Sequence, residues 1–299
     1  MMCTILTFVM LYSTPATTLP QASWTGSNSS TAEVDGKTLY FRGKNNIDAL
    51  MTALLTRHGM DDATEIVISG GSAGALAVYL HADALRAQMP ATAKVVAMPD
   101  DGFFMDNAES RASGWTAAKQ WVYQQHNSSA GVPEACLAQY AGTGEEWKCF
   151  FAQYVAPTIK TPLFALQPMY DAYQTGAELG STVPSKVNAY GANLTATLKQ
   201  AVLAHPSNGG YLDGCWHHGG GWPAMQATSA SDKTWASPMD AFTVWYTADP
   251  VGSGTSRYWQ TPSNGALPDG RPASLFPCKN CCPCRPQNQT SSNFNNACK

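Results

Sequence analysis

The feature that most constrains the fold is a strand-like run that ends in a glycine-rich turn and continues with helical composition. Residues 64–69 (TEIVIS) are rich in β-branched side chains, residues 70–74 read GGSAG, and residues 75–89 (ALAVYLHADALRAQM) favour a helix. The turn matches the G-x-S-x-G pattern, in which a serine stands at a sharp strand-to-helix bend. The pattern therefore predicts a strand, a tight turn and a helix around Ser72.

Small residues are needed at this turn because the strand and the helix pass each other closely. Gly70 and Gly74 supply that room, and the bend presents the Ser72 hydroxyl at the carboxyl end of the strand. The N–H of Ala73, at the start of the helix, would point at a developing oxyanion. A dinucleotide-binding G-x-G-x-x-G cannot be laid over GGSAGALA, and the Gly-Lys-Ser/Thr ending of a phosphate loop is absent. Ser72 is therefore the candidate nucleophile.

Strand-like and helix-like runs alternate along the chain. Residues 46–58 have apolar positions at helical spacing, and strand-like runs recur at residues 93–98 (AKVVAM) and 162–166 (PLFAL). Such alternation is typical of parallel βαβ units. It predicts an α/β fold of the α/β-hydrolase type, with a mostly parallel sheet flanked by helices.

One catalytic domain with two flanking segments is expected. Residues 23–262 would form the α/β-hydrolase catalytic domain, and residues 263–299 a Cys- and Pro-rich extension. Residues 1–22 are interpreted either as a signal peptide or as a residual strand of the domain. The extension carries CKNCCPCRP, but no second spaced pair or histidine follows in register, so we expect disulfides there and no metal site.

Composition excludes several classes of partner. The formal net charge is −3, which provides no basic face for nucleic acid, and no apolar run reaches the ~18 residues of a membrane span. Nine cysteines accompany four Asn-X-Ser/Thr sequons, at Asn28, Asn127, Asn193 and Asn288. This combination is typical of an oxidising, glycosylating compartment. A secreted protein of the extracellular space or cell wall is expected.

A serine nucleophile needs a carboxylate and a histidine, and in this fold they follow the serine in the order acid, then histidine. The acid should lie just past the end of a later strand. Asp171 does so after PLFAL, whereas Asp100 and Asp101 follow AKVVAM one strand earlier and are the second choice. Asp171 is therefore the favoured acid.

The same chain order restricts the choice of base. His58 precedes Ser72 and is excluded, and the candidates beyond Asp171 are His205, His217 and His218. The adjacent pair follows the compact run YLDGCW and is favoured. Because adjacent side chains cannot both face one serine, spacing leaves the choice between the two open.

Several stretches, in order along the chain, together resemble the pectin acetylesterase family, which also contains the lipid-removing Notum carboxylesterases. The stretches are TLYFRGKNNIDALMTALL, VISGGSAGALAVYLHADALR, AKVVAMPDDGFFMD, CFFAQYVAPTIKTPLFALQPMYDAYQ, GGYLDGCWHH and a weaker AFTVWYTAD. They run from Thr38 to Asp249. The combination is much more specific than G-x-S-x-G alone.

The resemblance implies a role for individual residues. The family nucleophile falls on Ser72 and its acid on Asp171, and the family histidine, three residues after a cysteine, falls on His218. A family cysteine pair falls on Cys136 and Cys149, which implies a disulfide; closing such a loop contributes roughly 3 kcal/mol in the chain-entropy picture. Two further residues, Phe103 and Phe104, would line the substrate pocket by family analogy.

The resemblance also implies an activity. It implies ester hydrolysis through an acyl-enzyme, which removes O-acetyl groups from pectin or a related cell-wall polysaccharide, without cofactor or metal and by a monomer. The alternatives are a Notum-like lipid carboxylesterase and a non-catalytic glycan-binding or truncated family member. Acyl-chain preference separates the first two, and labelling of Ser72 by a fluorophosphonate separates both from the third.

The chain departs from the family pattern before the nucleophile. Family members carry an early Gly-Gly-Gly-Trp segment that supplies further oxyanion donors, and nothing between Met1 and Ser69 matches it. The GGGW at residues 219–222 follows the histidine pair, so the role is not transferred to it. The family also has cysteines where this chain has Gly71 and Ala82. A chain truncated or rebuilt at its amino edge is expected, and the loss of one oxyanion donor costs about 10²–10³ in kcat.

Overall fold

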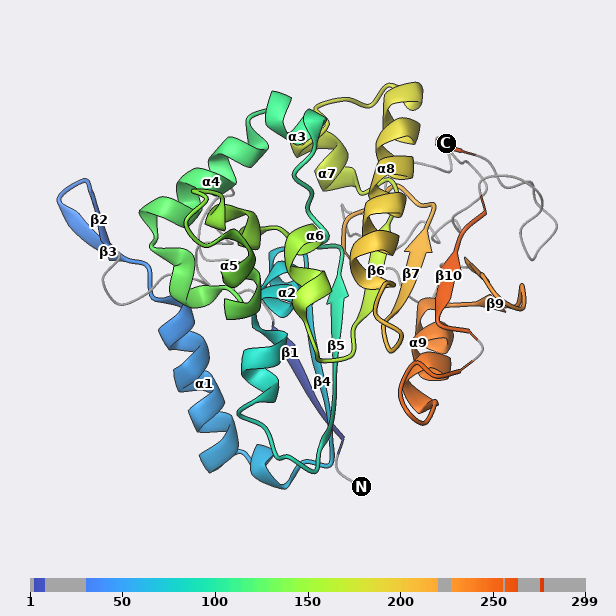
Figure 1. Ribbon diagram of the computed structural model, residues 1–299, viewed down its shortest axis with the longest axis horizontal. Coiled ribbons are helices and arrows are strands. Elements are labelled where there is room, and N and C mark those ends of the chain that lie inside the picture. Colours follow the sequence, from blue (N-terminus) through green and yellow to red (C-terminus); the bar gives the residue numbers. More distant parts are fainter. Residues whose placement is uncertain (1–2, 9–30, 220–226, 255, 263–274, 277–299) are drawn as a thin grey trace, which may run out of the picture. The chain divides into compact units, whose positions relative to one another are not determined.

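The computed structural model describes residues 3–8, 31–219, 227–254, 256–262 and 275–276 (Figure 1). The chain divides into two compact units. Unit 1 comprises Met1–Asn107 and Gly114–Thr161, and unit 2 comprises Ala108–Ser113 and Pro162–Lys299. Each unit is built around its own group of parallel strands, so the two are described in turn.

Unit 1 is centred on three parallel strands in the order β1, β4, β5. They are β1 (Cys3–Phe8), β4 (Glu65–Gly71) and β5 (Lys94–Asp100). In the register of these strands Ile66 pairs with Val95, and Phe8 of β1 pairs with Gly70 of β4. β4 and β5 are buried through their middle residues, as expected for parallel strands covered on both faces.

Helix α2 (Ala73–Arg86) follows β4 directly and packs against β4 and β5. Nearly all residues of α2 are buried, and many of them are alanine or glycine. Such small side chains let a helix approach a sheet closely. The other elements of unit 1 are the hairpin β2 (Thr31–Val34) and β3 (Lys37–Tyr40), the helices α1 (Gly43–Arg57), α4 (Trp115–Gln125), α5 (Glu134–Tyr140) and α6 (Ala152–Val155), and the 3₁₀ turns η2 (Met60–Asp62), η3 (Ser128–Gly131), η4 (Glu146–Phe150) and η5 (Ala156–Thr158).

In the part of unit 2 that the structure describes, there are five strands. They are β6 (Phe164–Pro168), β7 (Gly209–Asp213), β10 (Tyr258–Gln260), β8 (Ala227–Ser229) and β9 (Trp235–Ala236). β6, β7 and β10 pair in parallel, and β8 and β9 extend the group in antiparallel fashion. The helices of unit 2 are α3 (Ala108–Ala112), α7 (Ala172–Ala177), α8 (Pro184–Val202) and α9 (Pro238–Thr247).

Aromatic side chains fill the core of unit 2. The ring of Phe164 on β6 lies 5.2 Å from Trp245 of α9 and 6.1 Å from Trp259 of β10. All three side chains are fully buried, and rings at these separations add to the burial of apolar surface. Helix α9 is fixed at its start by a capping box between Ser237 and Asp240.

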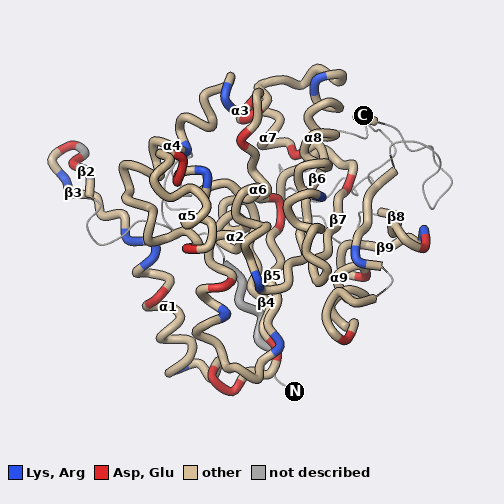
Figure 2. Tube along the Cα trace, viewed as in Figure 1, with Lys and Arg blue, Asp and Glu red and all other residues tan. Residues whose placement is uncertain are grey.

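The α/β fold with mostly parallel strands flanked by helices is confirmed. The predicted strands at residues 64–69, 93–98 and 162–166 correspond to β4, β5 and β6, each displaced by one or two residues. The predicted helix at residues 46–58 begins earlier, at Gly43. Of the described helices, none is long and apolar enough to cross a membrane. Lysine, arginine and acidic residues intermix along the described elements (Figure 2).

The predicted segment boundaries stay predictions. Within residues 1–22 the structure describes β1 (Cys3–Phe8) as a strand, whereas residues 9–22 lie outside the described residues. Most of the 263–299 extension, including CKNCCPCRP, also lies outside them.

Candidate active site

Ser72 is the single residue between the end of β4 and the start of α2, and it has φ 58° and ψ −120°. A positive φ at a residue other than glycine costs on the order of 1–3 kcal/mol and persists only where the surroundings enforce it. The Ser72 N–H donates to the Asp100 carbonyl at 2.8 Å, and the Ser72 carbonyl accepts from the N–H groups of Ala75 and Leu76 at 3.0 and 3.1 Å. Strand β5 and the first turn of α2 therefore hold the serine in this conformation.

Gly70 and Gly102, on the two segments beside Ser72, are required by close backbone contacts. A Cβ atom at Gly70 would lie 2.5 Å from the Gly74 carbonyl oxygen, so no side chain fits there. A Cβ atom at Gly102, on the loop after β5, would lie 2.5 Å from the Ser72 carbonyl oxygen. By contrast, Gly71 has open space around its Cβ position. Gly70 and Gly74 thus form a close crossing of strand and helix.

Ala73 is the first residue of α2 and is buried. The first four N–H groups of a helix have no acceptor within the helix and carry the positive end of its dipole. The Ala73 N–H is therefore suited to bind a negative oxygen next to Ser72.

The loop after β5 carries the other site candidates of unit 1. Asp101 has φ 58° and is buried. Phe103 and Phe104 are buried as well: Phe103 packs edge-on against Tyr79 at 6.0 Å, and Phe104 lies 5.8 Å from Trp115. Both phenylalanines thus serve the core of unit 1, and a role in lining a substrate pocket stays a prediction.

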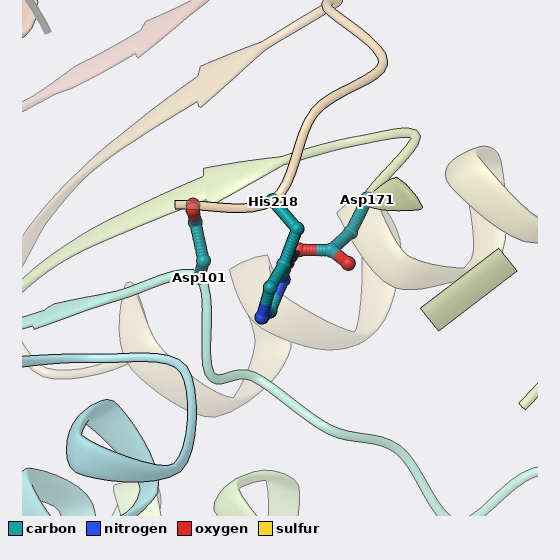
Figure 3. A group of neighbouring side chains, drawn as sticks. All are labelled: Asp101, Asp171 and His218. Atoms are coloured by element: carbon teal, nitrogen blue, oxygen red, sulfur yellow. Dashed lines mark hydrogen bonds and ion pairs between the residues drawn. The ribbon is translucent and has the colours of Figure 1, made fainter. Parts of the chain in front are cut away.

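In unit 2, Asp171 caps the N-terminus of α7. Its Oδ1 accepts hydrogen bonds from the N–H groups of Tyr173 and Gln174, both at 2.9 Å, and the side chain is fully buried. Oδ2 lies 2.7 Å from Nδ1 of His218, a distance typical of a charge-assisted hydrogen bond (Figure 3). The carboxylate is therefore held by the helix end while it orients the imidazole.

His218 lies on the loop after β7, and its side chain is 21% exposed. When Nδ1 keeps its proton and donates a hydrogen bond to Asp171, the neutral ring has its lone pair on Nε2. An imidazole held in this tautomer can act as a general base through Nε2.

The neighbouring His217 is paired with a different acid. Its Nε2 lies 3.1 and 3.3 Å from the two carboxylate oxygens of Asp213, the last residue of β7, and both side chains are buried. The His217 carbonyl accepts from the Ala172 N–H at 2.9 Å, and the Asp213 carbonyl accepts from the Met169 N–H at 2.8 Å. The Asp213–His217 pair therefore links the loop after β7 to the start of α7.

These contacts separate the three histidines that the sequence left as candidates. His218 contacts Asp171, His217 contacts Asp213, and the exposed His205 makes a local 2.7 Å hydrogen bond with Ser207. Asp100, one of the two alternative acids, is the last residue of β5, and its backbone carbonyl accepts the hydrogen bond from the Ser72 N–H.

The sequence analysis did not identify a group of hydrogen-bonded residues next to Asp171. Thr175 donates its hydroxyl to the Asp171 carbonyl at 2.9 Å and accepts from the Trp216 indole N–H at 3.1 Å. At the C-cap of α7, the buried Glu178 accepts from the hydroxyl of Tyr190. Burial and the adjacent carboxylate raise the pKa of Tyr190 well above its usual value, so this hydroxyl stays a donor. The spacing of Gln174 and Glu178 on one helix face is the sequence signal that could have indicated this network.

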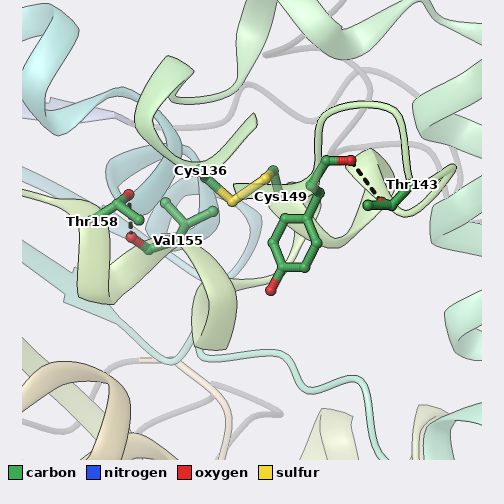
Figure 4. Close-up of a disulfide and its surroundings, with 6 residues drawn as sticks. Cys136, Thr143, Cys149, Val155 and Thr158 are labelled. Carbon is green, nitrogen blue, oxygen red and sulfur yellow. Dashed lines mark hydrogen bonds between the residues drawn. A yellow bond between two sulfur atoms is a disulfide. The ribbon is translucent and has the colours of Figure 1, made fainter. Parts of the chain in front are cut away.

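The implied disulfide between Cys136 and Cys149 is confirmed (Figure 4). It joins α5 to η4, and its Cα atoms are 5.8 Å apart. Cys215, three residues before His218, is also disulfide-bonded.

Parallel strands flanked by helices, a serine on a strained strand-to-helix turn and a carboxylate–histidine pair after later strands together define the α/β-hydrolase class. The pectinacetylesterase family matches residues 20–249. The chain therefore belongs to the pectinacetylesterase family.

Individual relatives agree with this assignment. Pectin acetylesterase 11 of Arabidopsis thaliana is 31% identical over 216 residues, which cover 65% of this chain and 54% of the relative. Human palmitoleoyl-protein carboxylesterase NOTUM is 28% identical over 210 residues, 65% of this chain and 41% of that protein. The chain thus spans about half the length of the curated relatives it matches.

A crystal structure of the Wnt deacylase Notum from Drosophila has a similar fold. It gives a TM-score of 0.63 at 21% identity and covers 80% of this chain and 69% of that chain. A second crystal form gives a TM-score of 0.54 at 23% identity, with 67% and 57% covered. At these identities the likeness concerns the fold alone.

Proposed function

We propose that the chain is a serine carboxylic-ester hydrolase that removes O-acetyl groups from pectin or a related cell-wall polysaccharide. The observation that carries the proposal is the 2.7 Å hydrogen bond between Asp171 and His218, in a member of the pectinacetylesterase family whose Ser72 is held on a strained turn. The matched plant relatives, which are named pectin acetylesterases, support the substrate class.

The proposed reaction has two halves. The Ser72 Oγ attacks the ester carbonyl carbon while its proton passes to Nε2 of His218, and the Ala73 N–H binds the oxyanion. When the tetrahedral intermediate collapses, the bond to the sugar oxygen breaks and His218 returns the proton to that oxygen. A water molecule then attacks the acyl-enzyme with the same base, so acetate leaves and Ser72 regains its proton.

Asp171 holds the imidazole tautomer and stabilises the imidazolium that forms in each half. The route needs neither metal nor cofactor. We also propose that the protein acts as a secreted monomer in the extracellular space or cell wall. The Cys136–Cys149 disulfide and the four sequons support the location, because disulfides persist in oxidising compartments.

The direct test is the Ser72→Ala variant, assayed on p-nitrophenyl acetate and for acetate release from acetylated pectin. Removal of the nucleophile is expected to lower kcat by about 10⁴-fold or more. A folded Ser72→Ala protein that keeps full activity would reject the scheme.

A second candidate is a lipid carboxylesterase, which the likeness to human NOTUM favours. The two are separated by the ratio of kcat/KM on acetate and octanoate esters. A higher kcat/KM on octanoate would favour the lipid substrate. A third reading is a non-catalytic glycan-binding protein, which predicts that Ser72 in the folded protein is not labelled by a fluorophosphonate.

A further inference from the structure

Tyr173, the second residue of α7, contacts both members of the Asp171–His218 pair. Its backbone N–H donates to Oδ1 of Asp171 at 2.9 Å. Its ring centroid lies 5.2 Å from that of the His218 imidazole, with 31° between the two planes. Tyr173 is thus bound to the carboxylate through its backbone and covers the imidazole with its ring.

The burial of the three side chains shows how they are layered. Asp171 is fully buried, the side chain of His218 is 21% exposed, and Tyr173 is 40% exposed. A ring with that much exposure removes less apolar surface from water than a buried ring does, so it contributes less to stability through burial. Burial alone therefore explains little of why an aromatic residue occupies this position.

The backbone of His218 lies on a loop, so contacts of its side chain set the direction of the imidazole. The Asp171 hydrogen bond fixes Nδ1. An aromatic ring against the imidazole adds a restraint on the plane of the imidazole, since offset or tilted rings at 4.5–7 Å attract each other. The ring of Tyr173 therefore restricts the direction in which Nε2 points.

We propose that Tyr173 is a positioning residue that holds the His218 imidazole in the rotamer from which Nε2 can take a proton. It acts through the face of its ring and not through its hydroxyl group. The proposal rests on the proposed esterase function, in which His218 is the base.

The test compares Tyr173→Ala, Tyr173→Leu and Tyr173→Phe on p-nitrophenyl acetate. Tyr173→Ala is expected to lower kcat by about 10- to 100-fold with KM within about twofold, because a misdirected base affects the chemical step more than binding. Tyr173→Leu keeps apolar bulk without an aromatic plane and is expected to lie between alanine and wild type. Tyr173→Phe keeps the ring and is expected to retain kcat within about twofold. Tyr40→Ala, which removes a 58% exposed tyrosine of β3, is the matched control and is expected to match wild type.

The proposal is overturned if folded Tyr173→Ala keeps kcat within twofold of wild type, or if Tyr173→Phe loses as much as Tyr173→Ala. A change confined to KM would also overturn it, since that is the signature of a substrate contact. Failure of the esterase function itself would appear separately, as full activity of Ser72→Ala. In that case the low-field proton NMR signal of His218 Nδ1–H decides: it weakens in Tyr173→Ala if the ring holds the imidazole and is unchanged if it does not.

Discussion

Replacement of Asp171 by asparagine tests the acid–histidine pair with little change in shape. In the structure Oδ1 accepts two backbone N–H groups, from Tyr173 and Gln174, and Oδ2 faces Nδ1 of His218. An asparagine oxygen can replace Oδ1, so its NH₂ group must then face His218. Because that NH₂ can only donate, the imidazole must present an unprotonated Nδ1 and carry its proton on Nε2, where the base needs its lone pair.

The expected effect on catalysis is large and the effect on folding is small. The same acid-to-amide change in a serine protease lowers kcat by about 10⁴-fold, which corresponds to about 5.4 kcal/mol in the barrier. Asparagine caps helices about as well as aspartate, so the start of α7 is retained. The bond to His218 changes from one to a charged group, which contributes about 1.5–3 kcal/mol, to a neutral one, which contributes about 0.5–1.5 kcal/mol, and this loss of about 1 kcal/mol is partly offset because asparagine buries no charge.

The assay is kcat on p-nitrophenyl acetate, with thermal unfolding measured on the same preparations. Asp213→Asn is the matched control, because it changes the equivalent atom of the neighbouring pair with His217. Asp171→Asn is expected to lose at least 100-fold more activity than Asp213→Asn. If folded Asp171→Asn stays within tenfold of wild type, Asp171 does not orient the base and the reasoning is refuted.

The two other predictions concern the neighbouring histidine and the disulfide. His218→Asn is expected to abolish fluorophosphonate labelling of the nucleophile. His217→Asn is expected to retain labelling but to lower the unfolding temperature, because it leaves the buried Asp213 carboxylate without its imidazole. Equal labelling of the two variants would contradict the assignment of His218 as the base. The Cys136→Ser, Cys149→Ser double variant is expected to lose about 2–4 kcal/mol in the free energy of unfolding, measured by denaturant titration, with an unchanged KM; an unchanged midpoint would show that the bridge contributes nothing.

The strands that the sequence predicted are those with continuous apolar, β-branched runs. TEIVIS and AKVVAM became β4 and β5, and pairing between them extends β4 to Gly71, a residue that has low strand propensity by itself. β7 (GGYLD) was not predicted, because it begins with two glycines and its extended conformation depends on pairing with β6 and β10. The local sequence pattern therefore predicted strands whose own residues favour an extended conformation. It missed β7, whose extended conformation depends on pairing with its neighbours.

For the candidate site as well, the residues set by local sequence could be predicted and those set by distant contacts could not. Ser72 could be predicted because its turn is encoded within five consecutive residues. Residue spacing could not choose between His217 and His218, since their acids lie four and forty-seven residues away. Only the resemblance to a family favoured His218. Tyr173 was missed because its role depends on a ring contact with a residue distant in sequence.

The adjacent histidines make the length of the loop after β7 part of the chemistry. Side chains at consecutive positions point in different directions, and here each direction leads to its own carboxylate, Asp213 or Asp171. Deletion of a single residue between Asp213 and His217 would therefore move His218 to the position that pairs with Asp213, and Asp171 would lose its imidazole. In this chain the number of residues between Asp213 and His218 is therefore more strictly fixed than their identity.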